Sequence, residues 1–159
     1  PYQYIEKLIP LTITNLLCGK SVPVYGDGKN IRDWLHVDDH CKGIIDIINS
    51  KFVGETFNIG GGAEKTNINL IKDICERVDD KLSQNSKVKE TFPNSAIANN
   101  SKSFELIKYV KDRLGHDKRY AINSSKICDK IGYKSLIPFT HGIDMTIDWY
   151  INNADWWQK

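Results

Sequence analysis

The stretch Ile31-Arg32-Asp33-Trp34-Leu35-His36-Val37-Asp38-Asp39-His40 decides the fold, because a strand pattern gives way to a helix pattern within it. We expect a short strand over residues 33–37. Asp38 is expected to cap the following helix, since its carboxylate can accept hydrogen bonds from the unpaired N–H groups of the first turn. The helix repeats apolar residues with i, i+3, i+4, i+7 spacing, which predicts one buried stripe. This stripe consists of Cys41, Ile44, Ile45 and Ile48.

Upstream of this stretch, the sequence predicts a helix followed by a strand. Pro10 suits the first turn of a helix over residues 10–18, and Gly19 suits the left-handed conformation that ends a helix. Val22–Tyr25 is expected to form a short strand. Residues 26–28 read Gly-Asp-Gly and predict a turn, because glycine adopts positive φ without strain.

Downstream, a further strand is expected at residues 56–59, running into the three glycines of residues 60–62. Asn67 is expected to cap the next helix. That helix carries a second apolar stripe at the same spacing. Its members are Ile71, Ile74, Cys75 and Val78.

The second half of the chain starts with a polar segment. Residues 83–103 are rich in Ser, Asn and Lys and show no period, which predicts an inserted surface loop or linker. Helices are expected at Ser125–Ile131, ended by Gly132, and at residues 139–153. Strands and helices alternate along the chain, so the fold class is α/β. A length of 159 residues is typical of one domain.

The composition excludes several classes of partner. The chain has 22 basic and 20 acidic residues, a net charge of +2, which is too even for a nucleic-acid or anionic-membrane surface. No run approaches the length of a membrane span, and no secretion signal stands at the start. The four cysteines are scattered, which is typical of buried thiols in a reducing compartment and predicts a cytoplasmic protein.

Three cations are candidates for binding a phosphorylated ligand. Arg32 and Arg113 each present a rigid guanidinium that matches two phosphate oxygens, and Lys7 lies near the start of a helix. Taken alone, each arginine is better explained as a solvated surface charge.

Five blocks of the sequence make a ligand-binding role the better explanation of these arginines. They read Pro1-Tyr2 with Glu6-Lys7-Leu8-Ile9-Pro10-Leu11, Pro23-Val24-Tyr25-Gly26-Asp27-Gly28, Ile31-Arg32-Asp33-Trp34-Leu35-His36-Val37 with Asp39-His40, Asn58-Ile59-Gly60-Gly61 with Glu64-Lys65-Thr66-Asn67, and Asp112-Arg113-Leu114-Gly115-His116-Asp117-Lys118-Arg119-Tyr120-Ala121. In order and spacing they resemble the C-terminal part of the dTDP-glucose 4,6-dehydratases, in the extended short-chain dehydrogenase/reductase superfamily. The resemblance covers nearly the whole chain except the insert at about 83–103.

The resemblance implies that residues 1–159 are the nucleotide-sugar-binding region of such an enzyme and lack most of its Rossmann domain. The full-length protein would be a lyase that converts dTDP-glucose to dTDP-4-keto-6-deoxyglucose with tightly bound NAD. NAD would be held mainly by the N-terminal half, which is absent from this chain, so the chain alone is expected to be inactive. The full-length protein is expected to be a homodimer.

The resemblance also implies a set of substrate-binding residues, with no catalytic residue, cofactor ligand or metal ligand among them. The set is Lys7, Leu8, Pro23, Val24, Tyr25, Arg32, Asn67, Asp112, Arg113 and His116. Lys7 and Leu8 would contact the ligand near its phosphates. Arg32 and Arg113, far apart in sequence, would converge on one diphosphate.

The remaining members of the set would bind the nucleoside. Residues 23–25 would line the base, with backbone groups reading its edge, and Asn67 would form a hydrogen bond to the nucleotide. Asp112 and His116 would complete the pocket wall. Leu114 stands where the family usually has proline, so the loop that carries Arg113 is expected to be less rigid.

Three short patterns are rejected as functional motifs. Tyr25 and Lys29 spell Tyr-x-x-x-Lys, but the glycines between them oppose the helix that this motif needs. The glycines of residues 60–62 lack the spacing of a dinucleotide-binding turn and are expected to form a tight turn instead. His36 and His40 are not expected to share a helix face, which argues against zinc.

The sequence leaves several alternatives open. One is a UDP-sugar dehydratase, decarboxylase or epimerase of the same superfamily. Another is a nucleotide-sugar-binding module without catalysis. A third is a fragment with no function of its own, whose residues 56–59 belong to a sheet outside this chain and expose an edge that favours aggregation. The preference for dTDP or UDP, the oligomeric state and the role of the insert are not fixed by the sequence.

Overall fold

The computed structural model describes residues 1–158, which fall into two compact units. The first unit comprises Pro1–Lys29, Asn67–His116 and the chain from Asp144 onward. The second unit comprises Asn30–Thr66 and Asp117–Ile143. No helix in the described part of the chain combines the length and apolar character needed to cross a membrane.

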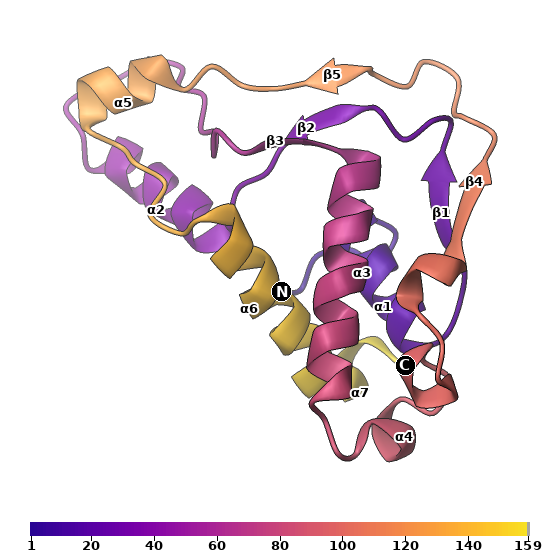
Figure 1. Ribbon diagram of the computed structural model, residues 1–159. Helices are drawn as coiled ribbons and strands as arrows, with labels where there is room; N and C mark the ends of the chain where they lie inside the picture. Colours follow the sequence, from indigo (N-terminus) through magenta and orange to yellow (C-terminus); the bar gives the residue numbers. More distant parts are fainter. Residues whose placement is uncertain (159) are drawn as a thin grey trace. The chain divides into compact units, whose positions relative to one another are not determined.

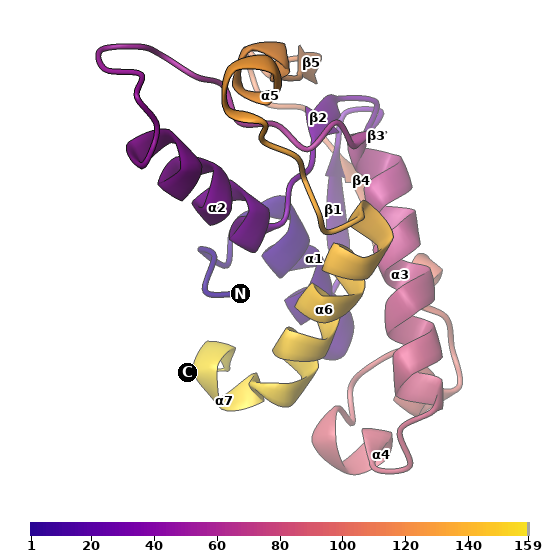
Figure 2. The same cartoon turned by 90° about the vertical axis from the view of Figure 1, so that its left-hand side faces the viewer.

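The first unit is built on two parallel strands (Figures 1 and 2). Its strands are β1 (Val22–Tyr25) and β4 (Ile107–Val110), and its helices are α1 (Leu8–Leu17), α3 (Asn67–Ser83), α4 (Val88–Thr91), η1 (Ile97–Asn99), η2 (Ser103–Leu106) and α7 (Ala154–Trp157). The helix α6 (Phe139–Asn152) starts in the second unit and ends in the first. β1 and β4 pair in register, from Val22 opposite Ile107 to Tyr25 opposite Val110.

The core of the first unit lies between α1, β1 and α3. The predicted stripe of α3 is confirmed, because Ile71, Ile74, Cys75 and Val78 are all buried. Burying one such side chain stabilises the fold by about 1.5–3 kcal/mol. Burial also raises the pKa of Cys75 to about 12, so its thiol stays protonated.

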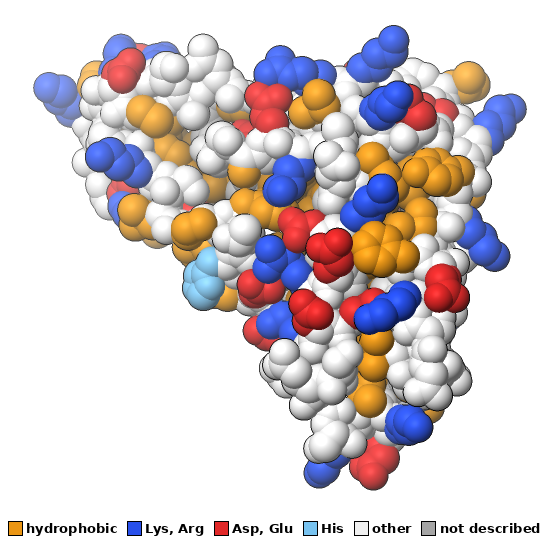
Figure 3. All heavy atoms as spheres, in the orientation of Figure 1, with side chains coloured by type: hydrophobic (Ala, Val, Ile, Leu, Met, Phe, Trp, Pro, Cys, Tyr) orange, Lys and Arg blue, Asp and Glu red, His pale blue; other side chains and the backbone are white. Residues whose placement is uncertain are grey.

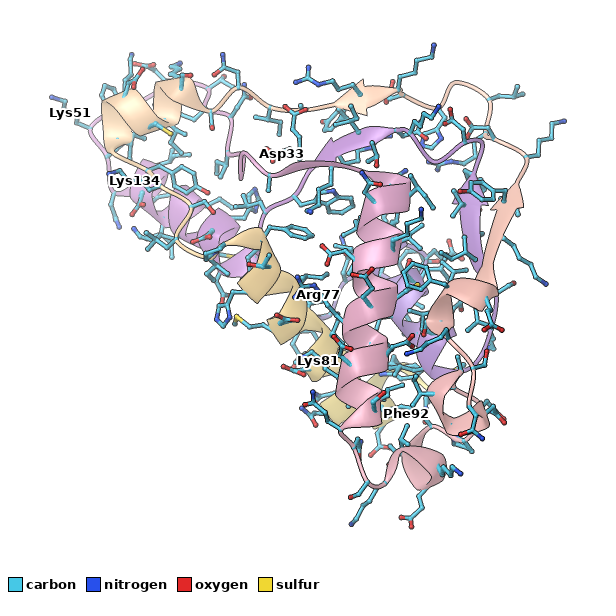
Figure 4. All side chains as sticks on the ribbon, in the orientation of Figure 1. Asp33, Lys51, Arg77, Lys81, Phe92 and Lys134 are labelled. Atoms are coloured by element: carbon cyan, nitrogen blue, oxygen red, sulfur yellow. The ribbon has the colours of Figure 1, made fainter. Side chains whose placement is uncertain are left out.

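Ion pairs on the surface of the first unit join α3 to the end of α6. Arg77 and Lys81 extend from successive turns of α3 (Figure 4). The Arg77 guanidinium donates to Asp144 at 2.8 Å, and Lys81 Nζ lies 2.6 Å from a carboxylate oxygen of Asp148. Because both acids are four residues apart on α6, they lie on one face of that helix.

The segment at residues 83–103 is not the structureless loop that the sequence predicted. It contains α4 and η1, and Phe92 is buried although the segment around it is mostly polar. The amide of Ser103 donates to the carboxylate of Asp79, which ties the end of the segment to α3. One aromatic anchor and one buried acid therefore hold a segment whose composition resembles that of a linker.

The second unit contains a three-stranded sheet in the order β3-β2-β5. Its elements are β2 (Ile31–Asp33), α2 (Val37–Ile48), β3 (Glu64–Thr66), β5 (Arg119–Tyr120) and α5 (Ser125–Ile131). β2 pairs antiparallel with β3 and parallel with β5. The prediction of α5 is confirmed, including Gly132 at positive φ as its end.

Two strand predictions in the second unit are wrong. The strand expected at residues 33–37 lies at Ile31–Asp33, and residues 56–59 form no strand. The third strand is instead the short β3 at Glu64–Thr66. Strands this short are set by their partners across the sheet, which a local pattern does not record.

The start of α2 also differs from the prediction. The helix begins at Val37, and His36 caps it by accepting a hydrogen bond from the amide of Asp38 at 3.3 Å. Asp38 is therefore not the cap. The next acid, Asp39, is buried and accepts hydrogen bonds from Ser135 Oγ at 2.9 Å and from the amides of Leu136 and Ile137 at 3.1 and 2.9 Å.

The predicted burial of the α2 stripe is wrong. Cys41 is exposed, and Ile44, Ile45 and Ile48 are 42%, 55% and 73% exposed. The opposite face is the buried one, with Gly43 packed so closely that a Cβ there would lie 3.1 Å from atoms of Ile59 and Tyr133. The spacing shows correctly that the isoleucines share a face, but it carries no information on what covers that face. Cys128 is likewise exposed, against the expectation of buried thiols.

We predict that Asp39→Asn destabilises the second unit by about 1–3 kcal/mol at neutral pH, because three hydrogen-bond donors lose a buried, charged acceptor. Burial acts to raise the pKa of Asp39, but the hydrogen bonds from Ile137, Leu136 and Ser135 outweigh it and hold the pKa below its ordinary value of 3.8. The stabilisation is therefore present above about pH 4 and is lost as the pH falls through the lowered pKa.

Urea denaturation followed by circular dichroism at several pH values tests this prediction. Asp38→Asn is the matched control, because that neighbouring carboxylate is largely exposed and its loss should cost at most about 0.5–1 kcal/mol. Equal losses for the two variants, or a loss for Asp39→Asn that persists at acid pH, would contradict the assigned role.

Candidate functional site

The candidate residues are divided between the two units. Arg32 belongs to the second unit, and every other member of the predicted set belongs to the first. The convergence of Arg32 and Arg113 on one diphosphate remains a prediction. The two groups are therefore described separately.

In the first unit, the parallel register of β1 and β4 creates the site. Tyr25 and Val110 end their strands opposite each other, so the segments that follow them leave at the same edge of the sheet. The amide of Gly26 donates to the carbonyl of Val110 at 3.0 Å and closes this edge. The Gly26-Asp27-Gly28 turn has positive φ at both glycines, which confirms the predicted turn and excludes a helix between Tyr25 and Lys29.

Arg113 lies against Tyr25 at this edge. Its guanidinium carbon is 5.4 Å from the centre of the Tyr25 ring, within cation–π range. Arg113 is exposed, and within residues 1–158 its guanidinium donates no hydrogen bond. The ring supports a cation whose five N–H donors remain available to a ligand.

Asp112 organises the loop that carries Arg113. Its carboxylate accepts a hydrogen bond from the amide of Arg113 at 2.8 Å and lies 2.7 Å from Nδ1 of the nearly buried His116. The hydrogen bond from His116 is the main reason why the pKa of Asp112 lies below its usual range. Leu114 is fully exposed in this loop. The Asp112 carboxylate therefore contacts both the start and the end of the loop.

Asn67 is the least satisfied polar residue of the group. Its Oδ1 is buried without a hydrogen-bond partner, so Asn67 does not cap α3 through its side chain as the sequence suggested. The next residue, Ile68, donates its amide to the carbonyl of Gly28 at 2.9 Å and fixes the start of α3 beside the turn. A buried acceptor without a donor costs about 1–3 kcal/mol, which a ligand N–H or O–H group would recover.

Lys7 and Leu8 lie at the start of α1. Lys7 is the exposed residue that precedes the helix, and Leu8 is its half-buried first residue. The first N–H groups of a helix have no partner within it, so an anion is favoured near this end. Among the residues predicted to line the base, Val24 is buried, Pro23 is half-buried and Tyr25 is exposed.

In the second unit, Arg32 is held by backbone carbonyls. Its guanidinium donates to the carbonyl oxygens of Ile31 at 2.7 Å and Asp117 at 3.0 Å. A guanidinium has five N–H donors, so the remaining ones can bind an anion. β5 and β2 are thereby fixed to each other at the position of Arg32.

The sheet around Arg32 is further held by two acids. Arg119 on β5 and Glu64 on β3 form a bidentate ion pair. Arg119 Nη2 donates to Glu64 Oε1 at 2.7 Å, and Arg119 Nε donates to Oε2 at 3.0 Å. Asp33, labelled in Figure 4, accepts hydrogen bonds from the amides of Gly61 and Ala63 at 3.0 and 2.8 Å. The Asp33 carboxylate thus occupies the amide of Gly61, one of the three glycines of residues 60–62.

Sequence reasoning missed two groups that position the candidate residues. The carboxylates of Asp33 and Asp39 were treated as a strand residue and part of a family block, whereas both bind backbone amides distant in sequence. The same block contains the exposed Asp38, so the sequence carries no signal that separates these two acids from a surface acid. On the face shown in Figure 3, acidic and basic side chains intermix and form no patch of one sign.

The chain matches the family model described as GDP-mannose 4,6 dehydratase over residues 1–146. It is 44% identical to a dTDP-glucose 4,6-dehydratase from Escherichia coli, with 100% of this chain and 41% of the relative covered. The crystal structure of the Bacillus anthracis dTDP-glucose 4,6-dehydratase in complex with NAD superposes with a TM-score of 0.79 at 41% identity and covers 99% of this chain and 43% of that one. The structure of DesIV, a dTDP-glucose 4,6-dehydratase from Streptomyces venezuelae solved with NAD, superposes with a TM-score of 0.79 at 37% identity. The match covers 99% of this chain and 42% of DesIV. The chain thus spans about 41% of the length of the curated relatives.

We predict that Gly26→Ala costs about 2–4 kcal/mol of unfolding free energy. Its φ is +59°, which strains any L side chain, and a Cβ would lie 2.8 Å from Oδ2 of Asp112. Gly115→Ala is the matched control, because φ there is +68° but no atom lies within 4 Å of the added Cβ. Gly115→Ala should lower the free energy of unfolding only by the backbone strain, about 1–2 kcal/mol.

Chemical denaturation of both variants, and of Gly26→Ala combined with Asp112→Ala, measures the difference. The second substitution should recover the part of the loss that comes from the clash. Equal costs for the two glycines would show that Asp112 does not contact the turn.

Proposed function

The chain belongs to the GDP-mannose 4,6-dehydratase family, and on this basis we propose that residues 1–159 are the nucleotide-sugar-binding region of a dTDP-glucose 4,6-dehydratase. The full-length protein would be a homodimeric cytoplasmic lyase that removes water from dTDP-glucose and forms dTDP-4-keto-6-deoxyglucose. The observation that carries the proposal is Arg113, supported on the Tyr25 ring with unused donors, in a chain that matches dTDP-glucose 4,6-dehydratases along its whole length.

The diphosphate is bound by cations in this proposal. Arg113 and Arg32 each keep N–H donors in a fork that fits two phosphate oxygens. Arg113 contacts an aromatic ring and Arg32 donates to two backbone carbonyls, and both guanidinium groups keep further N–H donors for phosphate oxygens. Lys7, at the start of α1, adds a third positive charge and a helix end that favours anions.

The nucleoside is bound by the edge of β1 and by Asn67. Among residues 23–25, Pro23 is half-buried and Tyr25 is exposed, so these two side chains and the backbone of the strand are open to the base. The unpartnered Oδ1 of Asn67 accepts a hydrogen bond from the ligand. His116, oriented by Asp112, completes the wall.

Within residues 1–158, the two motifs that resemble NAD-binding patterns are not free to bind NAD in this proposal. The amide of Gly61 is bound by Asp33, and Tyr25 and Lys29 flank a turn rather than share a helix face. NAD would therefore be bound mainly by the part of the family protein that this chain does not cover. This chain would bind the diphosphate and the base. The sugar is then restricted to a position in which it can react, and this orientation lowers the barrier of the reaction.

We predict that Arg113→Ala and Arg32→Ala each weaken dTDP binding by about 10- to 100-fold, because each removes a charge-assisted contact of about 1.5–3 kcal/mol. Affinity for thymidine, which has no phosphate, should stay unchanged. Isothermal titration of the purified chain measures both, with Lys108→Ala as control, an exposed cation of β4 outside the set.

The double variant tests convergence. If both arginines bind one diphosphate, the two losses in binding free energy are not additive. Additive losses would place the arginines on separate groups. A parallel titration with UDP decides the base preference, and tighter binding of UDP than of dTDP would favour a UDP-sugar enzyme of the same superfamily.

We also predict that the chain alone does not turn over dTDP-glucose, because NAD is expected to be bound mainly by the part of the family protein that this chain does not cover. Incubation with dTDP-glucose and NAD, followed by chromatography for the 4-keto product, tests this. Product formation with this polypeptide as the sole protein would refute the assignment of a binding role.

A further inference from the structure

Three aromatic rings of the first unit, one near the start of the chain and two from its last helices, form a cluster. The ring centre of Tyr2 lies 4.8 Å from that of Trp149 and 5.4 Å from that of Trp156, and the two tryptophan rings are 5.2 Å apart. The interplanar angles are 63°, 87° and 70°, so all three contacts are edge-to-face, an arrangement in which aromatic rings attract each other. We call these three residues the aromatic cluster.

The two tryptophans of the aromatic cluster are fixed by the fold. Trp149 lies on α6 next to the fully buried Tyr150, with ring centres 5.0 Å apart. Trp156 lies on α7, which is anchored by the buried Trp157, whose indole N–H donates to the carbonyl of Tyr150 at 2.8 Å. The amide and the side chain of Asn153 both donate to the carbonyl of Trp149, at 3.0 and 2.8 Å, and join α6 to α7. The tryptophans are therefore a rigid partner for Tyr2.

Tyr2, in contrast, belongs to a segment without a buried side chain. Residues 2–7 are all exposed, and Tyr2 itself is 69% exposed. Its φ is +59°, in the left-handed region, which strains a residue that carries a Cβ. The contacts with Trp149 and Trp156 offset this strain, because the attraction of two edge-to-face pairs is of the same order as the strain of one left-handed residue.

The path of this segment sets the position of Lys7. The amide of Lys7 donates to the carbonyl of Tyr4 at 3.0 Å and closes a turn, and the carbonyl of Lys7 accepts from the amide of Leu11 at 2.9 Å. α1 therefore fixes Lys7 on its carboxyl side, whereas its amino side depends on residues 2–4. Within residues 1–158, the Lys7 side chain forms no capping hydrogen bond, so the backbone on both sides sets the direction in which its ammonium extends.

We propose that Tyr2 is a positioning residue for the diphosphate. Its ring, packed on Trp149 and Trp156, fixes the path of residues 2–7 and thereby the place at which the Lys7 ammonium meets the phosphate oxygens. A lysine ammonium is a point charge on a flexible stem, so its contribution to anion binding depends on where its backbone is held. Tyr2 acts through Lys7 and not by contact with the ligand. The inference deepens the proposed function and rests on it, because it takes Lys7 as a phosphate contact.

A measurement without ligand tests the positioning by itself. In Tyr2→Ala, the amide of Lys7 should exchange with deuterium about fivefold faster than in the unchanged chain or faster still, because loss of the ring frees the turn that protects it. The amide of Leu11, which lies within α1, is the internal control and should exchange at the same rate in both proteins. Equal exchange of the Lys7 amide in the two proteins would overturn the proposal.

Isothermal titration measures the consequence for binding. Tyr2→Ala should weaken dTDP binding about 3- to 10-fold, the loss expected from one or two aromatic contacts. Its affinity for thymidine and its urea midpoint should stay unchanged, because residues 2–7 bury no side chain. Tyr2→Phe keeps the ring and should restore the affinity. Tyr4→Ala is the matched control, an aromatic residue of the same segment that is 65% exposed and lies outside the aromatic cluster, and it should change none of these quantities.

Lys7→Ala, alone and combined with Tyr2→Ala, separates this inference from the proposed function. If Tyr2 acts through Lys7, the double variant binds dTDP no more weakly than Lys7→Ala does. Additive losses, a Tyr2→Phe variant as weak as Tyr2→Ala, or full affinity of Tyr2→Ala beside a weakened Lys7→Ala would each overturn the role of Tyr2. An unchanged chain that does not bind dTDP would contradict the proposed function instead, and the exchange of the Lys7 amide would still decide whether Tyr2 positions it.

Discussion

The parallel pairing of β1 with β4 is the constraint on which the candidate site of the first unit depends. Its register brings Tyr25 opposite Val110, so the turn at residues 26–28 and the loop from Asp112 to His116 leave from one edge. Gly26 has no Cβ, which allows the Asp112 carboxylate to approach the turn. A slip of one residue would move every side chain of the strand to the other face and separate Tyr25 from Arg113.

In the second unit, buried and half-buried carboxylates have the corresponding role. Asp33 binds the amides of Gly61 and Ala63, and Asp39 binds those of Leu136 and Ile137. Each joins segments distant in sequence without entering any chemistry. The stretch from Ile31 to His40 therefore supplies both Arg32, a candidate ligand-binding cation, and the acids that hold the frame around it. Binding residues and scaffold residues are adjacent because one strand and one helix start serve both purposes.

The two amphipathic helices show how far a local pattern can be trusted. α2 and α3 have the same apolar spacing, yet Ile74 of α3 is buried and Ile48 of α2 is exposed. Spacing establishes that side chains share a face, because 3.6 residues make one turn. Whether the face is covered depends on the segments that pack against it, which the spacing does not record. Phe92 gives the converse case, since a polar composition concealed an anchored segment at residues 83–103.

The sequence by itself determined the family, the α/β class, the positions of α1, β1, α3, α5 and α6, and the set of ligand-binding candidates, because motifs and periodicity are properties of the linear chain. Only the tertiary structure decided that His36 caps α2, that Asp33 and Asp39 bind distant amides, that Tyr25 supports Arg113, and that the isoleucines of α2 face outward. Each of these depends on groups far apart in sequence, whose approach is fixed by packing and hydrogen bonding of the folded chain.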